Sequence, residues 1–428
     1  MTSKISNVDL YRVFAGILLV VGLIPFFRIP YFVQAIEDGA SYNDFIIVVV
    51  TLGAFLSMVY VVLTRQRVPA PFGWILLFQF CVLPFSITDG FDAQAVFSYY
   101  VPAAYATAYC WLIYLFIRKG DPLWISALNK ALWVLTLANF VAIIVYPTGM
   151  YHFGATNFES SYRNWVFGYD NRHAEFYIYA VMLSMFWCVR RTGKQISFSV
   201  VLLYLICLIS TILVKAGTSM VVLIVLGVYM AVQGRKENNR FFTIRGYLIL
   251  YAILLISLIV VVCGYVDPFG LRTFLLEDVF GKDATFSGRS GIWTSALSWI
   301  QSSFLFGNGI ESSSVLMAKL GHGSGAHNEI LGIWYLGGLV HFLFFLGLVL
   351  AAAKKLYQAR NTPVAKIISI AIFCILLLEL MRGCNELLWL SMYVMGYYCL
   401  EINDALTKQQ DKKQTKVDRV SLATESDK

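Results

Sequence analysis

The sequence predicts an all-α, polytopic integral membrane protein with about twelve transmembrane helices and a large extracytoplasmic loop that contains an interfacial helix. Of its 428 residues, 59% are hydrophobic and only 14% are charged, whereas soluble domains carry about a quarter charged residues. The mean hydropathy is +0.69. Apolar runs of about 20 residues, the length that a spanning helix needs, recur along the chain. These observations favour the membrane class.

The twelve expected helices are placed by their apolar runs. Their centres lie near Leu18, Leu52, Leu77, Cys110, Leu135, Met182, Leu205, Leu226, Leu255, Phe342, Ile372 and Met392. The first run follows basic residues, and no small-residue cleavage site comes after it. We therefore expect a retained first helix rather than a cleaved signal peptide.

Lysine and arginine are concentrated in alternate loops. The basic groups are Arg65 and Arg67; Arg118 and Lys119; Arg190, Arg191 and Lys194; Arg235, Lys236, Arg240 and Arg245; Lys354, Lys355 and Arg360; and, in the tail, Lys408, Lys412, Lys413 and Lys416. By the positive-inside rule these loops and both termini are cytoplasmic, which requires an even number of helices. The net charge of +8 is thus read as a signal of topology in a plasma (inner) membrane, and we expect no binding to nucleic acid.

The predicted organisation has four parts. Residues 1–265 form the N-terminal transmembrane helices with an outer loop at 147–174, residues 266–326 a large extracytoplasmic loop, residues 327–403 the C-terminal helices, and residues 404–428 a cytoplasmic tail. The second outer loop contains GRSGIWTSALSWIQSSF, whose apolar residues recur at helical spacing. This segment is too short to span, so we expect a helix in the interface with its tryptophans at headgroup depth. The alternative is a plain surface helix of a small outer domain.

The segment GHGSGAHNEILG, residues 321–332, lies just before a long apolar run. His322 and His327 are five residues apart, whereas a helical metal pair is spaced i, i+4. No cysteine or third histidine is near, so we expect no metal site. His327 and Asn328 are expected to begin the tenth helix, where a helix N-terminus favours the neutral imidazole that a general base needs. The alternative is a capping or interfacial histidine without a chemical role.

Arginine is also present on the expected outer face, where topology does not explain it. The outer cations are Arg163, Arg172, Arg272, Arg289 and Lys215. Arginine holds phosphate through a planar, bidentate fork. The segment SSYRNWVFGYDNRHAEF adds His173 together with aromatic and amide side chains of the kind that bind sugars. For each arginine the alternative is a lipid-headgroup anchor or a local salt bridge.

Two further patterns have structural interpretations. Glu379 and Arg382 are spaced i, i+3 and could form an ion pair near the outer end of the eleventh helix. The FGNG segment, residues 306–309, contains GxG without a strand–helix unit around it, so we expect a glycine turn. The chain has no DxD pattern, Walker motif or nucleophile elbow, which argues against a nucleotide-sugar transferase and against ATP as the energy source.

The order of the motifs SGRSGIW, FGNG and GAHN, followed by an apolar helix, resembles the O-antigen polymerase and ligase superfamily. These are the Wzy-type polysaccharide polymerases and their ligase relatives. The resemblance implies a substrate on the outer leaflet, an oligosaccharide linked to undecaprenyl pyrophosphate. It implies no cofactor and no metal, because the pyrophosphate is already a good leaving group.

The resemblance also assigns roles. Arg289 and Arg172 would stabilise the departing diphosphate, and His327 would deprotonate or orient the acceptor hydroxyl. The expected substrate-binding residues are Asn328, Arg163, His173, Lys215 and Asn308. This chain departs from relatives that carry an arginine in a serine-rich segment after the seventh helix, since it has VKAGTSM with Lys215 there. Lysine keeps the charge but lacks the bidentate grip.

Three functions are compatible with these features. The first is a polymerase that joins lipid-linked repeat units for a capsule, an exopolysaccharide or an O-antigen. The second is a ligase that transfers finished polymer to another acceptor. The third is a transporter or flippase for lipid-linked sugars, although carriers often show two related halves and this chain shows no repeat. A flippase and a chain-length regulator are candidate protein partners, beside membrane lipid.

Overall fold

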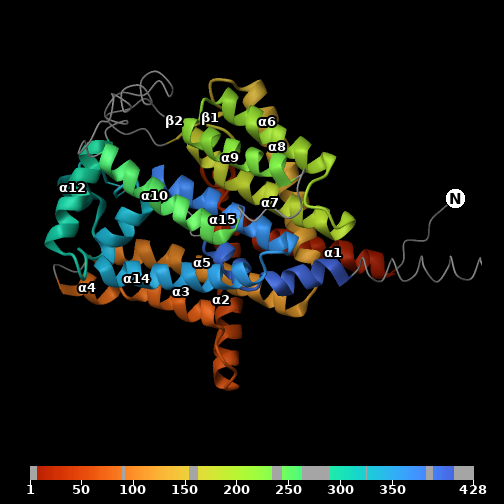
Figure 1. The fold of residues 1–428 in the computed structure, drawn as a ribbon, viewed down its shortest axis with the longest axis horizontal. Coiled ribbons are helices and arrows are strands. Elements are labelled where there is room, and N and C mark those ends of the chain that lie inside the picture. The colour runs from red at the N-terminus through yellow and green to blue at the C-terminus, as the bar shows by residue number, and fades with distance from the viewer. Residues whose placement is uncertain are drawn as a thin grey trace, which may run out of the picture.

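A computed structural model describes residues 7–88, 92–153, 162–233, 243–262, 289–323, 325–381 and 389–408. Figure 1 shows a bundle made almost entirely of helices. The exceptions are two short strands, β1 (Tyr151–Phe153) and β2 (Tyr162–Asn164), which pair antiparallel. No sequence pattern indicated this hairpin, which lies in the segment expected to be the first outer loop.

The N-terminal part of the chain contains α1 (Asn7–Leu23), η1 (Ile24–Phe27), η2 (Tyr31–Ala35), α2 (Gly39–Leu63), α3 (Ala70–Phe80), α4 (Leu83–Thr88), α5 (Ala93–Lys119) and α6 (Leu123–Val145). The middle contains η3 (Asp170–Arg172), α7 (His173–Thr192), α8 (Phe198–Leu213), α9 (Gly217–Gln233) and α10 (Ile244–Val262). The last part contains α12 (Arg289–Ser302), α13 (Ser313–Leu320), α14 (Glu329–Gln358), α15 (Pro363–Met381) and α16 (Trp389–Tyr397). Every predicted helix centre lies inside one of these helices.

Six helices in the described part of the chain are long and apolar enough to cross a membrane: α2, the continuous α3–α4 segment, α5, α6, α14 and α15. Helices α1, α8, α9 and α10 are apolar but shorter. The chain is therefore a multi-pass membrane protein. The full set of twelve spans stays a prediction.

Helix α7 lies at the centre of the bundle. It packs against α6, α8 and α15, and nearly every side chain from His173 to Val189 is buried. A helix that is apolar all round is expected to be covered on all sides. The start of α7, with η3 before it, is thus held rigidly by its neighbours.

Basic residues at several helix ends meet on one side of the bundle. Arg118, at the end of α5, and Lys355, near the end of α14, lie beside the adjacent tyrosines Tyr398 and Tyr397. Arg190, near the end of α7, lies close to the start of α1. These ends share a face, as the alternation of basic loops predicts, and α12 lies at the opposite end (Figure 1). That the basic face is cytoplasmic, with both termini on it, stays a prediction.

Helix α14 is broken within its apolar stretch. Gly337 and Gly338 leave helical geometry, and the segment after α12 lies against the break. The backbone N–H of Asn308 donates to the Tyr335 carbonyl at 2.7 Å, and that of Gly309 donates to the Leu336 carbonyl at 2.8 Å. The break therefore does not leave these carbonyls unpaired in an apolar environment. The FGNG segment forms the glycine turn expected from the sequence. In the fold, this turn donates hydrogen bonds to the carbonyl groups at the break.

The backbone of Leu305 approaches Gly338 closely at the break, so we expect the stability of the protein to depend strongly on Gly338. Its φ of 63° and ψ of −157° belong to a region that is essentially limited to glycine, and an added Cβ would lie 2.4 Å from the carbonyl carbon of Leu305. We expect Gly338→Ala to lower the stability by about 1–3 kcal/mol, measured as thermal unfolding in detergent. Gly332→Ala is the matched control, because Gly332 lies in the same helix with open space around its Cβ position. Equal unfolding temperatures for the two variants would contradict this explanation of the break.

The helix predicted for the second outer loop is present as α12, and the headgroup depth expected for its tryptophans stays a prediction. Trp293 is completely buried in a cluster with Ala326, Leu331 and Tyr335, so its ring packs inside the protein and not against lipid headgroups. Trp299 is partly exposed. Helix α12 thus packs onto the start of α14, and an interfacial position for it is not confirmed. Helix α13 was not predicted.

Candidate functional site

The start of α14 is fixed by Asn328. Its side-chain Oδ1 accepts a hydrogen bond from the Leu331 backbone N–H at 3.1 Å, and its Nδ2 donates to the Leu380 carbonyl at 3.1 Å. The first bond caps the helix, and the second joins it to the end of α15. Asn328 is almost completely buried. Its amide therefore positions the chain before α14 rather than presenting a surface to a sugar.

His327 is the residue directly before this cap. Its φ of 50° is in the left-handed region, which few non-glycine residues adopt. Its Nε2 lies 3.0 Å from a ring nitrogen of His322, and the ring centroids are 4.1 Å apart. The imidazole is only partly buried, so it remains open to a substrate. Unusual backbone conformations of this kind are often found at functional sites.

Arg289 is brought to the same region by Trp293. Arg289 is the first residue of α12, and Trp293, one turn later, is buried in the same cluster as Ala326, the neighbour of His327. Burial lowers the pKa of the Arg289 guanidinium, while the nearby Tyr169 opposes this shift. The side chain remains charged at neutral pH, because an arginine pKa is ordinarily above 12.

Tyr169 connects Arg289 to the segment before α7, since it immediately precedes η3. Arg172, the last residue of η3, is partly buried. Helix η3 contacts α9, and Lys215 is exposed in the left-handed turn (φ 58°) just before α9 begins. Arg172, Arg289 and Lys215 therefore come from segments that meet at the end of the bundle where α14 starts.

Two other predicted substrate-binding residues have different positions. His173 is fully buried, and its Nε2–H donates to the Gly168 carbonyl at 3.0 Å. This bond stabilises the loop before η3, so the ring has no surface for a substrate in this structure. Arg163 lies on β2, paired in register with His152, and its side chain is exposed.

Asn308 lies in the break of α14 and not at its start. Its side-chain Nδ2 donates to the Tyr335 carbonyl at 3.3 Å, the same carbonyl that its backbone N–H contacts. Both donors of the residue therefore serve the helix break. Arg272 and Arg382 lie outside the described residues, so neither the role expected for Arg272 nor an ion pair between Glu379 and Arg382 is assessed.

Glu379 is a residue whose position in the site the sequence did not reveal. Its carboxylate is fully buried near the end of α15, and within the described part of the chain neither oxygen has a hydrogen-bond partner. Glu175, in the first turn of α7, and Glu329, the first residue of α14, are its electrostatic neighbours. The starts of α7 and α14 and the end of α15 thus converge. The signal available in the sequence was an ionisable residue in an apolar helix, which is a functional candidate by default.

The dual role of Asn328 gives a prediction for stability. Asn328→Ala removes both hydrogen bonds, and we expect a loss of about 2 kcal/mol. Asn328→Ser keeps a capping oxygen and loses only the bond to Leu380, so it should retain about half of that stability. Thermal unfolding of the two variants beside the wild type measures the difference. An Asn328→Ala protein as stable as the wild type would rule out the capping role.

The sequence of residues 203–346 is similar to a known protein family. Residues 203–346 match the family model Wzy_C, described as O-antigen ligase. No curated protein matches the chain in sequence. The matched stretch contains the SGR, FGNG and HN motifs with Lys215, and it ends before α15. The match confirms the resemblance to the O-antigen polymerase and ligase superfamily, and it covers residues 203–346.

Proposed function

We propose that this protein is a polysaccharide polymerase that joins oligosaccharide repeat units linked to undecaprenyl pyrophosphate on the outer face of the plasma membrane. The observation that carries the proposal is the burial of Trp293 and Ala326 in one hydrophobic cluster, which brings Arg289 and His327 to one end of the bundle. That end lies opposite the face where the basic helix ends meet. An enzyme for a donor on the outer leaflet needs its cations and its base on that side.

The proposed reaction is a displacement at the anomeric carbon of the donor sugar. The acceptor hydroxyl attacks this carbon while the bond to the diphosphate oxygen breaks, and the bonding electrons leave with the polyprenyl diphosphate. His327 takes the proton of the acceptor hydroxyl. Arg289 and Arg172 stabilise the negative charge that develops on the leaving diphosphate. Attack opposite the leaving group inverts the anomeric configuration.

The other predicted site residues have different roles in this proposal. Lys215 and the exposed Arg163 bind diphosphate or sugar oxygens at the rim, where a long cation can reach a bulky substrate. Asn328 and His173 act as positioning residues, because their polar groups are used by the protein itself. Asn308 holds the broken helix. This assignment narrows the set of substrate-contacting residues relative to the expectation from the motifs.

A ligase is the second candidate, and the description of the matching family favours it. A ligase uses the same donor chemistry but transfers a finished polymer to a different acceptor. The position of the donor site therefore does not separate the two reactions. The length and the carrier of the glycan do.

Glycan length in a host that lacks the gene tests the proposal. A polymerase predicts single repeat units on their lipid carrier in the knockout and long polymer after wild-type protein is restored. Long polymer that stays on its lipid carrier in the knockout would identify a ligase instead. Repeat units trapped on the inner leaflet would identify a transporter, and the roles of His327 and Arg289 would then be withdrawn.

The proposed mechanism also predicts that activity does not depend on a metal ion. The diphosphate is already an activated leaving group, and protein cations meet its developing charge. Polymer formation in washed membranes should therefore be unchanged by EDTA. Inactivation by EDTA that is reversed by adding a divalent cation would contradict the mechanism.

A further inference from the structure

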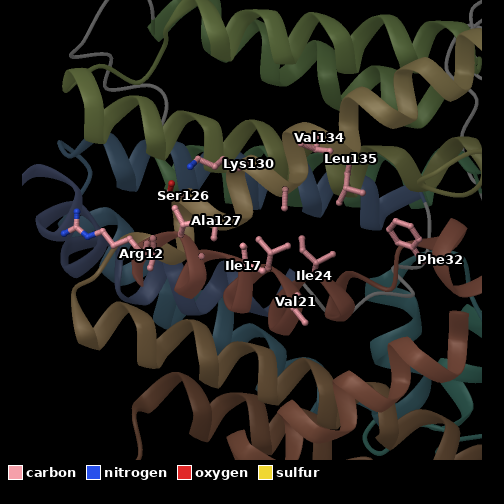
Figure 2. A pocket seen from close by; sticks show the side chains of 15 residues that line it. Arg12, Ile17, Val21, Ile24, Phe32, Ser126, Ala127, Lys130, Val134 and Leu135 are labelled. Carbon is pink, nitrogen blue, oxygen red and sulfur yellow. The ribbon is translucent and has the colours of Figure 1, made fainter. Parts of the chain in front are cut away.

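A cavity of about 650 Å³ lies between α1 and α6, away from the candidate functional site. Figure 2 shows its lining. Arg12, Ser126 and Lys130 lie toward one end, apolar side chains fill the middle, and Phe32 lies at the other end. The apolar part includes Ile17, Val21, Ile24, Val134 and Leu135. The cavity therefore has one polar, cationic end and a long hydrocarbon-like body.

The polar end of the cavity carries two cations, Arg12 and Lys130. Among the described residues, neither Arg12 nor Lys130 makes an ion pair, and both are exposed. Arg190 lies close to Arg12 and adds positive charge, while Asp121 is the acidic neighbour of Arg190. The described side chains at this end therefore carry more positive than negative charge. An anion beside Arg12 and Lys130 would be stabilised electrostatically.

The length of the cavity matches one leaflet of a bilayer. From Arg12 to Ile24 the helix rises about 18 Å, and half of a hydrocarbon core is about 15 Å thick. Lys130 lies in the second turn of α6, a helix that qualifies as a membrane span. A cation at that depth is costly unless it meets an anion or reaches the interface. A lipid phosphate at the interface supplies the anion.

We propose that this groove binds an anionic phospholipid of the leaflet that borders the basic face. Its phosphate lies between Arg12 and Lys130, and an acyl chain runs between α1 and α6 toward Phe32. Under the proposed topology this leaflet is the cytoplasmic one. The site is therefore distinct from the one proposed for the undecaprenyl pyrophosphate donor, whose diphosphate lies at the opposite end of the bundle.

The test uses the full-length protein in phosphatidylcholine vesicles with a trace of spin-labelled phosphatidylglycerol or spin-labelled phosphatidylcholine. Electron paramagnetic resonance measures the immobilised fraction of each label. We expect wild-type protein to prefer phosphatidylglycerol. In the double variant Arg12→Gln/Lys130→Gln, the preference for phosphatidylglycerol over phosphatidylcholine should be about thirtyfold smaller. The double variant Arg65→Gln/Arg67→Gln is the control, because it removes the same charge from two exposed positions that do not line the groove.

A second pair of variants tests the groove without changing its charge. Gly16 lines the cavity, and an added Cβ there meets no atom within 4 Å, so Gly16→Leu should fill the acyl-chain path and release the lipid. Gly22 lies on the same helix, has equally open space and does not line the cavity. Gly22→Leu should therefore keep the wild-type immobilised fraction.

Three results would overturn the proposal. The first is an equal immobilised fraction for both lipids in the wild type, and the second is an unchanged preference in Arg12→Gln/Lys130→Gln. The third is displacement of the label by unlabelled undecaprenyl phosphate more effectively than by unlabelled phosphatidylglycerol, which would identify a polyprenyl chain as the occupant. None of these measurements depends on enzymatic activity, so they stand or fall separately from the proposed polymerase function.

Discussion

Replacement of His327 by asparagine should reduce polymer formation by about 10²- to 10⁴-fold, the usual contribution of a general base. Asparagine is a sharper test than alanine, because it tolerates the left-handed backbone that His327 adopts with a φ of 50°. The fold around the cap at Asn328 should therefore persist. Polymer length and lipid-linked repeat units, measured after expression in the knockout host, report the loss.

The neighbouring ring provides the control for this prediction. His322→Gln removes the ring that lies 3.0 Å from the Nε2 of His327 and leaves the proposed base in place. Polymer should still form with His322→Gln, and no more than single repeat units should form with His327→Asn. A His327→Asn protein with wild-type activity would show that His327 is only an interfacial residue before α14.

Arg289→Lys should lower polymer formation by about 10²- to 10³-fold, the range found when one stabilising donor is removed. Lysine keeps a positive charge but loses the bidentate contact with the diphosphate. The half-buried position of Arg289 beside Tyr169 makes this loss larger than at an exposed site, since interactions there are less screened. Donor turnover by purified protein in vesicles measures it.

Gly291→Ala is the matched control for Arg289. It lies in the same first turn of α12, and an added Cβ there meets no atom within 4 Å, so its activity should equal that of the wild type. Comparable membrane levels for both variants would show that the effect is chemical. If Arg289→Lys retained full turnover, the role of its guanidinium in diphosphate stabilisation would be withdrawn.

Local sequence signals predicted much of the fold. Apolar runs located the helices, and Asn328 before the run ILGIWYLGGLVHFLFF indicated the start of α14, which the structure places at Glu329. The FGNG turn followed from its glycines. In each case the signal and the structure it specifies lie within a few residues of each other.

The features that were missed depend on contacts between distant segments. The apolar run of α14 continues through Gly337 and Gly338, so its composition gives no sign of the break. The groups that pair with the broken helix lie about 30 residues earlier in the chain, at Asn308 and its neighbours. From the sequence alone, Trp293 could lie either at the membrane interface or in the protein core. Only its burial in one cluster with Ala326 and Tyr335 shows that it belongs to the core.

For the candidate site, too, the sequence indicated single residues but not the contacts between distant segments. The sequence indicated Arg289, His327 and Asn328 as candidates, but it did not indicate that Tyr169 would lie beside Arg289 or that Glu379 would lie near Glu329. These approaches join the two predicted outer loops and the end of α15. They arise from helix packing, which single-sequence patterns do not encode.

The break in α14 also has a consequence for biogenesis. Carbonyl groups such as those of Tyr335 and Leu336 receive their hydrogen bonds from the turn that follows α12, and an unpaired carbonyl in hydrocarbon costs several kcal/mol. A newly made α14 therefore lacks these bonds until that turn reaches it. We expect the final seating of α14 in the bilayer to wait for the docking of an extramembrane segment, so that insertion and tertiary assembly are a single step at this helix.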